Sequence, residues 1–251
     1  MSIVSEAERI IENVANAYSV LSAKGATMPD EQNTENLASA IESIQAGEAM
    51  SIETVRLICG WQANGLPVGY TLLEYIEGSG TQYINTGVVG RSGLEAELEW
   101  EFTSIGSNNA ILASRHGSGV RIFLAYHTTI WIYGYSSAVS SSVTAETGVK
   151  YSIYCKLYNG EQLLAIDGTT VASGTTASNY YSDALALFAN NYKGSGNNMA
   201  SGKLYSCKIK AGGVLVRDFV PVINPDGEYG LWDKVGEKFY GNIGTGVFTG
   251  A

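Results

Sequence analysis

The chain has 251 residues, of which 45% are hydrophobic, enough for one large domain with a small appendage. Its formal net charge is −9 and its 15 lysines and arginines are scattered, which argues against nucleic acid or an anionic membrane surface as a partner. The longest apolar run is far shorter than the roughly 20 residues that cross a bilayer, so no membrane insertion is expected.

The N-terminal part, residues 1–47, is predicted to be helical. Over residues 1–23, apolar side chains recur at alternating spacings of four and three, as they do along a coiled-coil seam. These residues are Ile3, Ala7, Ile10, Val14, Ala17 and Leu21. A second helix is predicted over residues 34–46, with Thr34 as its N-cap and Gly47 as its end.

Two helices of this length are not stable alone in water, so they must pack against something. One interpretation is an intramolecular hairpin, and the other is an oligomerisation stalk, most simply a trimer. The N-terminus lacks the basic segment and unbroken apolar stretch of a signal peptide, so synthesis and folding in a cytoplasm are expected.

Residues 48–70 are predicted to form a linker, because the stretch QANGLPVG within them is rich in turn residues. From residue 71 the hydrophobic period changes to two, which is the spacing of β-strands. The predicted strands are 71–77, 81–87, 94–102, 110–115, 120–126, 129–135, 150–158, 161–166, 184–190, 202–210 and 214–223.

The dipeptides Asn159-Gly160 and Asp167-Gly168 are signals for two-residue hairpin turns. Many short strands with no long helices between them predict a mainly β domain over residues 71–251. The 30 glycines, the 16 tyrosines and a charged fraction of only 16% are also typical of a β-sandwich with many tight turns. A sandwich or jelly roll is therefore the expected architecture.

The strand predicted over residues 94–102, LEAELEWEF, alternates strictly between apolar residues and glutamates. This alternation places Glu97 and Glu101 on one face. The stretch ELEWE is similar to the E-x-D-x-E strand of laminarinase-like glycoside hydrolases, whose paired carboxylates lie about 5 Å apart, although Glu99 stands where those enzymes have aspartate. A glycoside hydrolase is thus one hypothesis. The alternative is the solvated face of an outer strand, whose like charges discourage edge-to-edge aggregation.

Aromatic residues gather in three places in the predicted domain. Trp131, Tyr133 and Tyr135 lie on one face of the strand 129–135. Tyr180 and Tyr181 lie in one predicted loop, and Tyr192 lies in another, the glycine-rich stretch 190–198. Flat aromatic rings beside Asn, Arg and Asp side chains suit sugar rings, and cross-strand packing is the alternative for any one of them. The candidate ligand-binding residues are Trp131, Tyr133, Tyr135, Tyr180, Tyr181, Tyr192, Arg115 and Asn191.

The sequence contains no motif for a metal or a cofactor, and none is expected. The three cysteines, Cys59, Cys155 and Cys207, form no C-x-x-C pair and are predicted to be buried apolar side chains. The two histidines are His116 and His127, and His116 is predicted to lie in an exposed loop.

Four segments of the predicted domain resemble the concanavalin A-like (laminin-G-like) domains of bacteriophage and prophage tail proteins. They are TQYINTG (81–87), ALALFANN (184–191), GKLYSCKIKAGGVLVRDFVPVINPDGEYGLWD (202–233) and KFYGNIGTGVF (238–248). The resemblance spans residues 71–251, and the N-terminal part also looks like the helical segments that precede tail-fibre modules.

The resemblance implies a two-sheet jelly roll in a virion tail or baseplate, in contact with host-surface carbohydrate and with other tail or baseplate proteins. A homotrimer would multiply weak sugar contacts. Within the matched segments, the residues expected to be structural are Arg217, Asp218, Trp232, Asp233, Phe239 and Phe248. A purely structural tail domain without a ligand remains an alternative.

Overall fold

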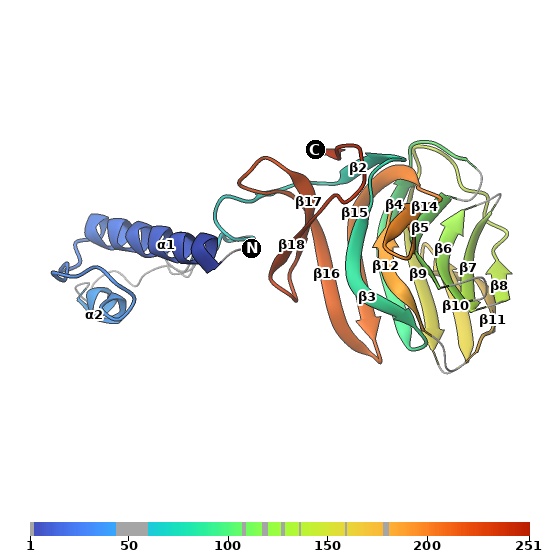
Figure 1. Cartoon of the computed structure of the whole chain (residues 1–251), viewed down its shortest axis with the longest axis horizontal. Coiled ribbons are helices and arrows are strands. Elements are labelled where there is room, and N and C mark those ends of the chain that lie inside the picture. Colours follow the sequence, from blue (N-terminus) through green and yellow to red (C-terminus); the bar gives the residue numbers. More distant parts are fainter. Residues whose placement is uncertain are drawn as a thin grey trace. The chain divides into compact units, whose positions relative to one another are not determined.

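The computed structural model of the chain describes residues 3–43, 60–106, 109–116, 120–126, 129–135, 137–158, 160–177 and 181–251. The chain divides into two compact units, Met1–Tyr70 and Thr71–Ala251, which we call unit 1 and unit 2. Figure 1 shows the helices in unit 1 and the strands in unit 2. Among the described residues, no helix is long and apolar enough to span a membrane.

Unit 1 contains two helices, α1 (Ile3–Ala23) and α2 (Leu37–Glu42). The C-terminal half of α1 packs on α2 through a small apolar cluster. Its buried members are Ala17, Tyr18, Leu21 and Ala40. The Tyr18 hydroxyl donates a 2.8 Å hydrogen bond to the carbonyl of Asn33 in the connection between the helices. This half of the heptad seam is therefore used within the chain, while Ile10 in the other half is 47% exposed.

The second helix is shorter than the sequence predicts. It begins at Leu37 after Asn36, and not directly after Thr34. The side chain of Asn33 accepts a 2.9 Å hydrogen bond from the backbone N–H of Asn36, which holds the intervening residues in a turn ahead of the helix. The predicted end at Gly47 lies outside the described residues.

The described part of the predicted linker is a closed turn. The backbone N–H of Gln62 donates a 2.7 Å hydrogen bond to the carbonyl of Leu66. The Gln62 side-chain amide donates to the carbonyls of Pro67 at 2.8 Å and Tyr70 at 2.6 Å. Leu66 is fully buried. Residues 60–70 are therefore held by their own hydrogen bonds.

Unit 2 consists of two β-sheets. The first sheet contains β1 (Thr71–Leu72), β2 (Ile76–Ser79), β4 (Leu94–Phe102), β9 (Lys150–Tyr158), β10 (Glu161–Ile166), β11 (Thr169–Thr175), β15 (Ser201–Ala211), β16 (Val214–Ile223), β17 (Tyr229–Asp233), β18 (Lys238–Gly241) and β19 (Thr249–Gly250). The second contains β3 (Ile84–Arg91), β5 (Asn109–His116), β6 (Val120–Tyr126), β7 (Ile130–Tyr135), β8 (Ser137–Ser140), β12 (Tyr181–Leu187), β13 (Asn190–Tyr192) and β14 (Ser195–Asn197).

The first sheet has the strand order β11-β10-β9-β4-β15-β16-β17-β18, with β2 on β15, β19 on β2 and β1 on β16. The second has the order β14-β13-β5-β6-β7-β8, with β12 joined to β5 and to β3. Among these named strand pairs, only β13 and β5 run parallel. One hydrophobic core lies between the sheets, with buried residues from both. The result is the predicted β-sandwich (Figure 1).

Five predicted strands, β4, β6, β9, β10 and β16, coincide with the observed ones. The single strand predicted over 71–77 is wrong, because this segment forms two short strands with different partners. β1 pairs with β16, and β2 pairs with β15. The strand predicted over 81–87 begins only at Ile84. There, the side-chain oxygen of Gln82 accepts hydrogen bonds from the backbone N–H groups of Ser79 and Thr81, which fold this stretch into a turn.

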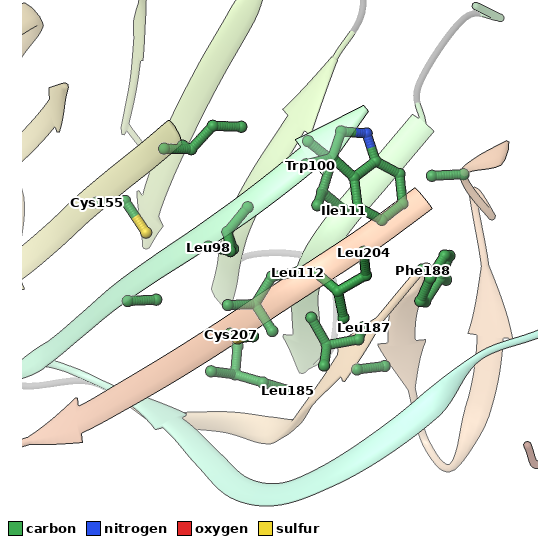
Figure 2. Close-up of a cluster of buried hydrophobic side chains, with 14 of the residues drawn as sticks. Leu98, Trp100, Ile111, Leu112, Cys155, Leu185, Leu187, Phe188, Leu204 and Cys207 are labelled. Carbon is green, nitrogen blue, oxygen red and sulfur yellow. The ribbon is translucent and has the colours of Figure 1, made fainter. Parts of the chain in front are cut away.

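The centre of the core is aromatic and aliphatic (Figure 2). The rings of Trp100 and Phe188 lie 4.9 Å apart, and Phe188 lies 4.9 Å from Phe248. Cys155 and Cys207 are buried free thiols, as predicted. Burial raises the pKa of Cys155 to about 12, so this thiol is protonated at neutral pH and does not act as a nucleophile.

Phe188 also reverses the chain between β12 and β13. Its φ of 64° lies in the left-handed region, which is unfavourable for a bulky residue. Two backbone hydrogen bonds hold this conformation, one from Phe188 N–H to the carbonyl of Ile111 at 2.8 Å and one from Ala200 N–H to the carbonyl of Phe188 at 2.9 Å. The strained residue is therefore fixed by the core, and it directs β13 back along β5.

Two of the residues expected to be structural, Asp233 and Arg217, take part in hydrogen bonds that hold unit 2 together. Asp233 is fully buried, and its Oδ1 accepts hydrogen bonds from the backbone N–H groups of Asp218 at 2.9 Å and Val235 at 3.1 Å. Arg217 on β16 donates from Nε to the carbonyl of Thr86 on β3 at 2.9 Å. This hydrogen bond joins the two sheets.

Candidate functional site

The four glutamates of β4 lie on the outer face of the first sheet. The apolar residues of the strand are buried and the glutamates are half-buried or exposed, as the alternation predicts. Strand β4 lies between β9 and β15, so it is not an edge strand. The suggestion that its charges prevent edge-to-edge aggregation is therefore wrong, because both of its edges are already paired.

Each glutamate has a partner on a neighbouring strand. The contacts are Tyr154 to Glu95 at 2.9 Å, Lys210 to Glu97 at 3.3 Å, Lys150 to Glu99 at 3.2 Å, and Lys203 and Tyr205 to Glu101 at 2.9 and 2.7 Å. Hydrogen bonds from Lys203 and Tyr205 hold the pKa of Glu101 below its usual value of 4.5. Burial, aided by the bond to Glu95, raises the pKa of Tyr154 to about 12.

This geometry does not fit the hydrolase hypothesis for Glu97 and Glu101. A general acid needs a raised pKa, whereas the pKa of Glu101 is lowered. The glutamates and their partners form a ladder of cross-strand pairs that stabilises the sheet.

A second group of polar and aromatic side chains lies where β5 and β13 end and β12 begins. The parallel pairing of β13 with β5 places Tyr192 directly beside Arg115. The guanidinium carbon of Arg115 lies 5.6 Å from the centre of the Tyr192 ring, and Nζ of Lys193 lies 5.4 Å from it. Nδ1 of His116 lies 3.2 Å from Oδ1 of Asp183, whose Oδ2 accepts a 2.6 Å hydrogen bond from the Lys193 backbone N–H. We call these five residues the Arg115–Tyr192 cluster.

The cluster is accessible from solvent. The side chain of His116 is 56% exposed and that of Asp183 is 22% exposed. Arg115 and Tyr192 are half-buried, and Lys193 is exposed. A ligand could therefore reach an aromatic ring, three nitrogen groups and a carboxylate at one place.

Local backbone conformation builds the cluster. The reversal at Phe188 returns the chain along β5, and Lys193 and Gly194, with φ of 52° and 84°, form the two-residue turn between β13 and β14. Asn191 is buried beneath this turn. Its side chain donates to the carbonyl of Ala184 at 2.7 Å and accepts from the backbone N–H of Gly194 at 3.0 Å. Asn191 therefore holds the turn in place and does not face a ligand, contrary to the prediction, and the predicted surface loops around it form a hairpin.

The other predicted aromatic candidates are only partly described. The backbone of Trp131, Tyr133 and Tyr135 lies in β7, and Tyr181 is the first residue of β12, but their side chains lie outside the described residues. Tyr180 lies outside them entirely. Ile130 and Ile132, which alternate with the aromatic residues of β7, are buried in the core.

Of the five residues of this cluster, the sequence analysis named Arg115 and Tyr192 as candidates and did not name His116, Asp183 or Lys193. His116 is exposed as expected, but it is the last residue of strand β5 and does not lie in a loop. Its contact with Asp183 joins residues 67 positions apart in the sequence. Within the described part of the chain, no group of three or more His, Cys, Asp or Glu side chains is placed to hold a metal ion.

Comparisons with known proteins support the fold of unit 2. No family model and no curated protein match the chain. A candidate carbohydrate-binding protein of Bacteroides ovatus matches with a TM-score of 0.51 at 14% identity, over 71% of this chain and 60% of that protein. The chain thus spans less than two thirds of that protein's length. The likeness shows that unit 2 has the fold of a jelly-roll β-sandwich, as predicted.

Two further structures have lower scores. The CBM40 module of the Ruminococcus gnavus IT-sialidase matches at 13% identity over 56% of this chain and 90% of the module, with a TM-score of 0.44. Domains LG4-5 of the mouse laminin alpha1 chain match at 14% identity over 61% of this chain and 45% of theirs, with a TM-score of 0.45.

Proposed function

We propose that unit 2 binds carbohydrate without cleaving it, and that the Arg115–Tyr192 cluster is the binding site. The observation that carries this proposal is the half-buried Tyr192 ring with the side chains of Arg115 and Lys193 at 5.6 and 5.4 Å from its centre. Loops and strand ends at the rim of a sandwich are common positions for ligand sites.

The chemistry of the cluster suits a sugar. An aromatic ring offers a flat apolar surface to the C–H face of a pyranose, while hydroxyl groups need donors and acceptors around it. Arg115, Lys193 and His116 provide donors, and Asp183 provides an acceptor. The pairs within the cluster hold these groups in place before a ligand arrives, which reduces the entropy lost on binding.

The same proposal extends to the biological setting. The protein acts in a bacteriophage or prophage virion, on a tail or baseplate, where it contacts host-surface carbohydrate. The resemblance of residues 202–233 to tail-protein domains supports this setting. Unit 1 provides the attachment to other tail proteins or to copies of itself, and three copies would raise avidity.

Glycan-array screening of the full chain, followed by titration calorimetry with a bound glycan, tests the binding proposal. Tyr192→Ala should weaken binding at least tenfold, equivalent to about 1.4 kcal/mol, as expected for a central aromatic contact. Tyr158→Ala is a matched control, because Lys156 lies 5.7 Å from the Tyr158 ring on the other sheet. A Tyr192→Ala protein that binds as well as wild type would refute the site, and a chain that binds no glycan would favour a purely structural role.

Two measurements test the setting. Light scattering of the full chain should give three times the monomer mass if unit 1 forms a trimer. Replacing the exposed Ile10 by aspartate should then return the mass to that of a monomer, because this residue lies in the part of the seam that α2 does not cover. A monomer in the wild-type protein at micromolar concentration would refute the trimer.

A further inference from the structure

The two-residue turn between β13 and β14, formed by Lys193 and Gly194, is held by side chains as well as by the pairing of its strands. Both residues are exposed, so water could satisfy the backbone groups of this turn. Three protein side chains bind them instead. The hydrogen bonds are Lys193 N–H to Asp183 at 2.6 Å, Gly194 N–H to Asn191 at 3.0 Å, and the Tyr83 hydroxyl to the Gly194 carbonyl at 3.2 Å. The conformation of the turn is therefore set from three directions.

Tyr83 comes from the most distant part of the sequence, 111 positions from Gly194. Its side chain is buried, and its ring packs on the backbone of β14, since a Cβ added at Gly196 would lie 2.7 Å from a ring carbon. Its own backbone is also fixed. The N–H group of Tyr83 donates to the Asn242 side chain at 3.1 Å, and its carbonyl accepts from the Ile243 N–H at 3.0 Å. The hydroxyl therefore meets the turn from a rigid position.

The turn determines where the aromatic ring of the Arg115–Tyr192 cluster lies. Tyr192 directly precedes the turn, and Lys193 is its first residue. The hairpin pairs with β5 through β13, so a change in the turn would move the Tyr192 ring relative to Arg115 on β5. A ring that stacks on a sugar must have one defined orientation, because only then do the surrounding polar groups meet the hydroxyl groups of the sugar.

We propose that Tyr83 is a positioning residue for carbohydrate binding, whose hydroxyl holds the β13–β14 turn so that Tyr192 is presented to the sugar in one orientation. This inference rests on the proposed function and adds a residue outside the Arg115–Tyr192 cluster. Tyr83 acts through Gly194 and does not contact the sugar. Without its hydroxyl, the turn adopts further orientations, and the apparent affinity falls with the fraction of molecules that are competent to bind.

The first measurement uses the full chain without a sugar. Tyr83→Phe removes the hydroxyl and keeps the ring that packs on β14. Amide hydrogen exchange of Lys193 and Gly194 should become about threefold faster or more, on the scale of one lost hydrogen bond. Exchange in β4 should stay at its wild-type rate, because that strand lies in the other sheet. This result would show that the hydroxyl restrains the turn.

The second measurement uses the oligosaccharide that gives the strongest signal on the glycan array. Tyr83→Phe should weaken its binding about three- to fivefold, as expected when the competent fraction falls. The loss should appear in the association rate, measured by NMR line shape, while the dissociation rate stays unchanged because the bound state keeps all its contacts with the sugar. Tyr192→Ala removes such a contact and should speed dissociation instead. The two rates therefore distinguish a positioning residue from a contact residue.

Two further variants control for a general loss of stability. Tyr151→Phe is the matched control, because the buried Tyr151 hydroxyl on β9 also has a backbone partner, the Glu146 N–H at 2.9 Å. It should change neither the exchange of the turn nor the binding of the oligosaccharide. Gly196→Ala keeps the Tyr83 hydroxyl but places a Cβ against its ring, so it should slow association in the same way as Tyr83→Phe. Thermal unfolding of each variant confirms that it is folded.

The outcomes separate this inference from the function it rests on. Wild-type affinity in Tyr83→Phe, with binding weakened in Tyr192→Ala, would overturn the positioning role and keep carbohydrate binding. A loss in Tyr83→Phe that lies in the dissociation rate would show direct contact with the sugar and also overturn it. An equal loss in Tyr151→Phe would show an effect of stability alone, with the same consequence. If the wild-type chain binds no arrayed glycan, both proposals fail.

Discussion

The glutamates of β4 allow a sharp test, because Glu97 and Glu101 share a strand, a face and a chemistry but differ in their surroundings. The side chain of Glu101 is 12% exposed, and it accepts hydrogen bonds from Lys203 at 2.9 Å and Tyr205 at 2.7 Å. The side chain of Glu97 is 50% exposed and has one contact, at 3.3 Å from Lys210. The same Glu→Gln substitution at each position should therefore have different effects on stability.

The expected magnitude follows from these contacts. Hydrogen bonds to a charged group contribute about 1.5–3 kcal/mol each, and glutamine retains one acceptor oxygen with roughly half that strength. Solvent screening near the surface reduces the remainder, so Glu101→Gln should lower the free energy of unfolding by about 1–2 kcal/mol. In a domain of this size that corresponds to a fall in Tm of about 2–8 °C. Glu97→Gln should change it by less than about 0.5 kcal/mol.

The pH dependence of unfolding tests whether the negative charge of Glu101 causes this difference in stability. Because the folded pKa of Glu101 lies below its usual 4.5, its carboxylate stabilises the fold fully above about that pH. This stabilisation is lost as the pH falls through the folded pKa. The difference between wild type and Glu101→Gln should therefore be constant from pH 7 to about 5 and shrink below pH 4.5.

Urea unfolding of both variants, from pH 3 to pH 7, measures these differences. Equal losses at the two positions would refute the argument, because burial and partner number would then not determine the contribution. A difference for Glu101→Gln that grows on acidification would refute the lowered pKa. Assays of both variants on polysaccharide also test the hydrolase hypothesis. Hydrolysis by the wild type that either substitution abolishes would restore that hypothesis.

Three further substitutions probe the packing. Gly202→Ala would add a Cβ against the Trp100 ring and should lower the unfolding free energy by about 2–3 kcal/mol in urea titration; an unchanged midpoint would contradict the tight approach. Asp233→Ala leaves two buried backbone N–H groups without an acceptor and should cost about 2–4 kcal/mol, whereas a loss under 1 kcal/mol would show that they find other acceptors. Leu21→Ala should speed amide hydrogen exchange in α1 but not in β4, because Leu21 belongs to the apolar cluster between α1 and α2; faster exchange in β4 would contradict this.

Local pattern was enough to predict much of the sandwich. Strict alternation in β4 and the Asn-Gly and Asp-Gly turns around β10 specify strands and hairpins without reference to distant residues. The prediction was wrong where contacts with residues far away in the sequence determine the backbone conformation. The break between β1 and β2 follows from a change of neighbour, and the reversal at Phe188 depends on hydrogen bonds to β5 and to Ala200.

The site was less predictable than the fold for the same reason. Arg115 and Tyr192 could be chosen by residue type, but their contact depends on a parallel pairing between β5 and β13 that no local signal indicates. Asn191 could also be chosen by type, yet both ends of its amide are bonded to the backbone. Residue type thus identifies candidates, and topology decides which of them face a ligand.

Both sheets of unit 2 carry a tyrosine with a lysine at cation–π distance, but the surroundings of the two lysines differ. On the first sheet, Nζ of Lys203 lies 4.8 Å from the centre of the Tyr75 ring and 2.9 Å from Glu101, so this pair belongs to the ladder of glutamates. On the second sheet, Nζ of exposed Lys193 lies 5.4 Å from the centre of the Tyr192 ring, and its backbone N–H donates to Asp183. An aromatic ring with polar groups around it, at strand ends on the rim of a sandwich, is the arrangement that we propose to bind a sugar.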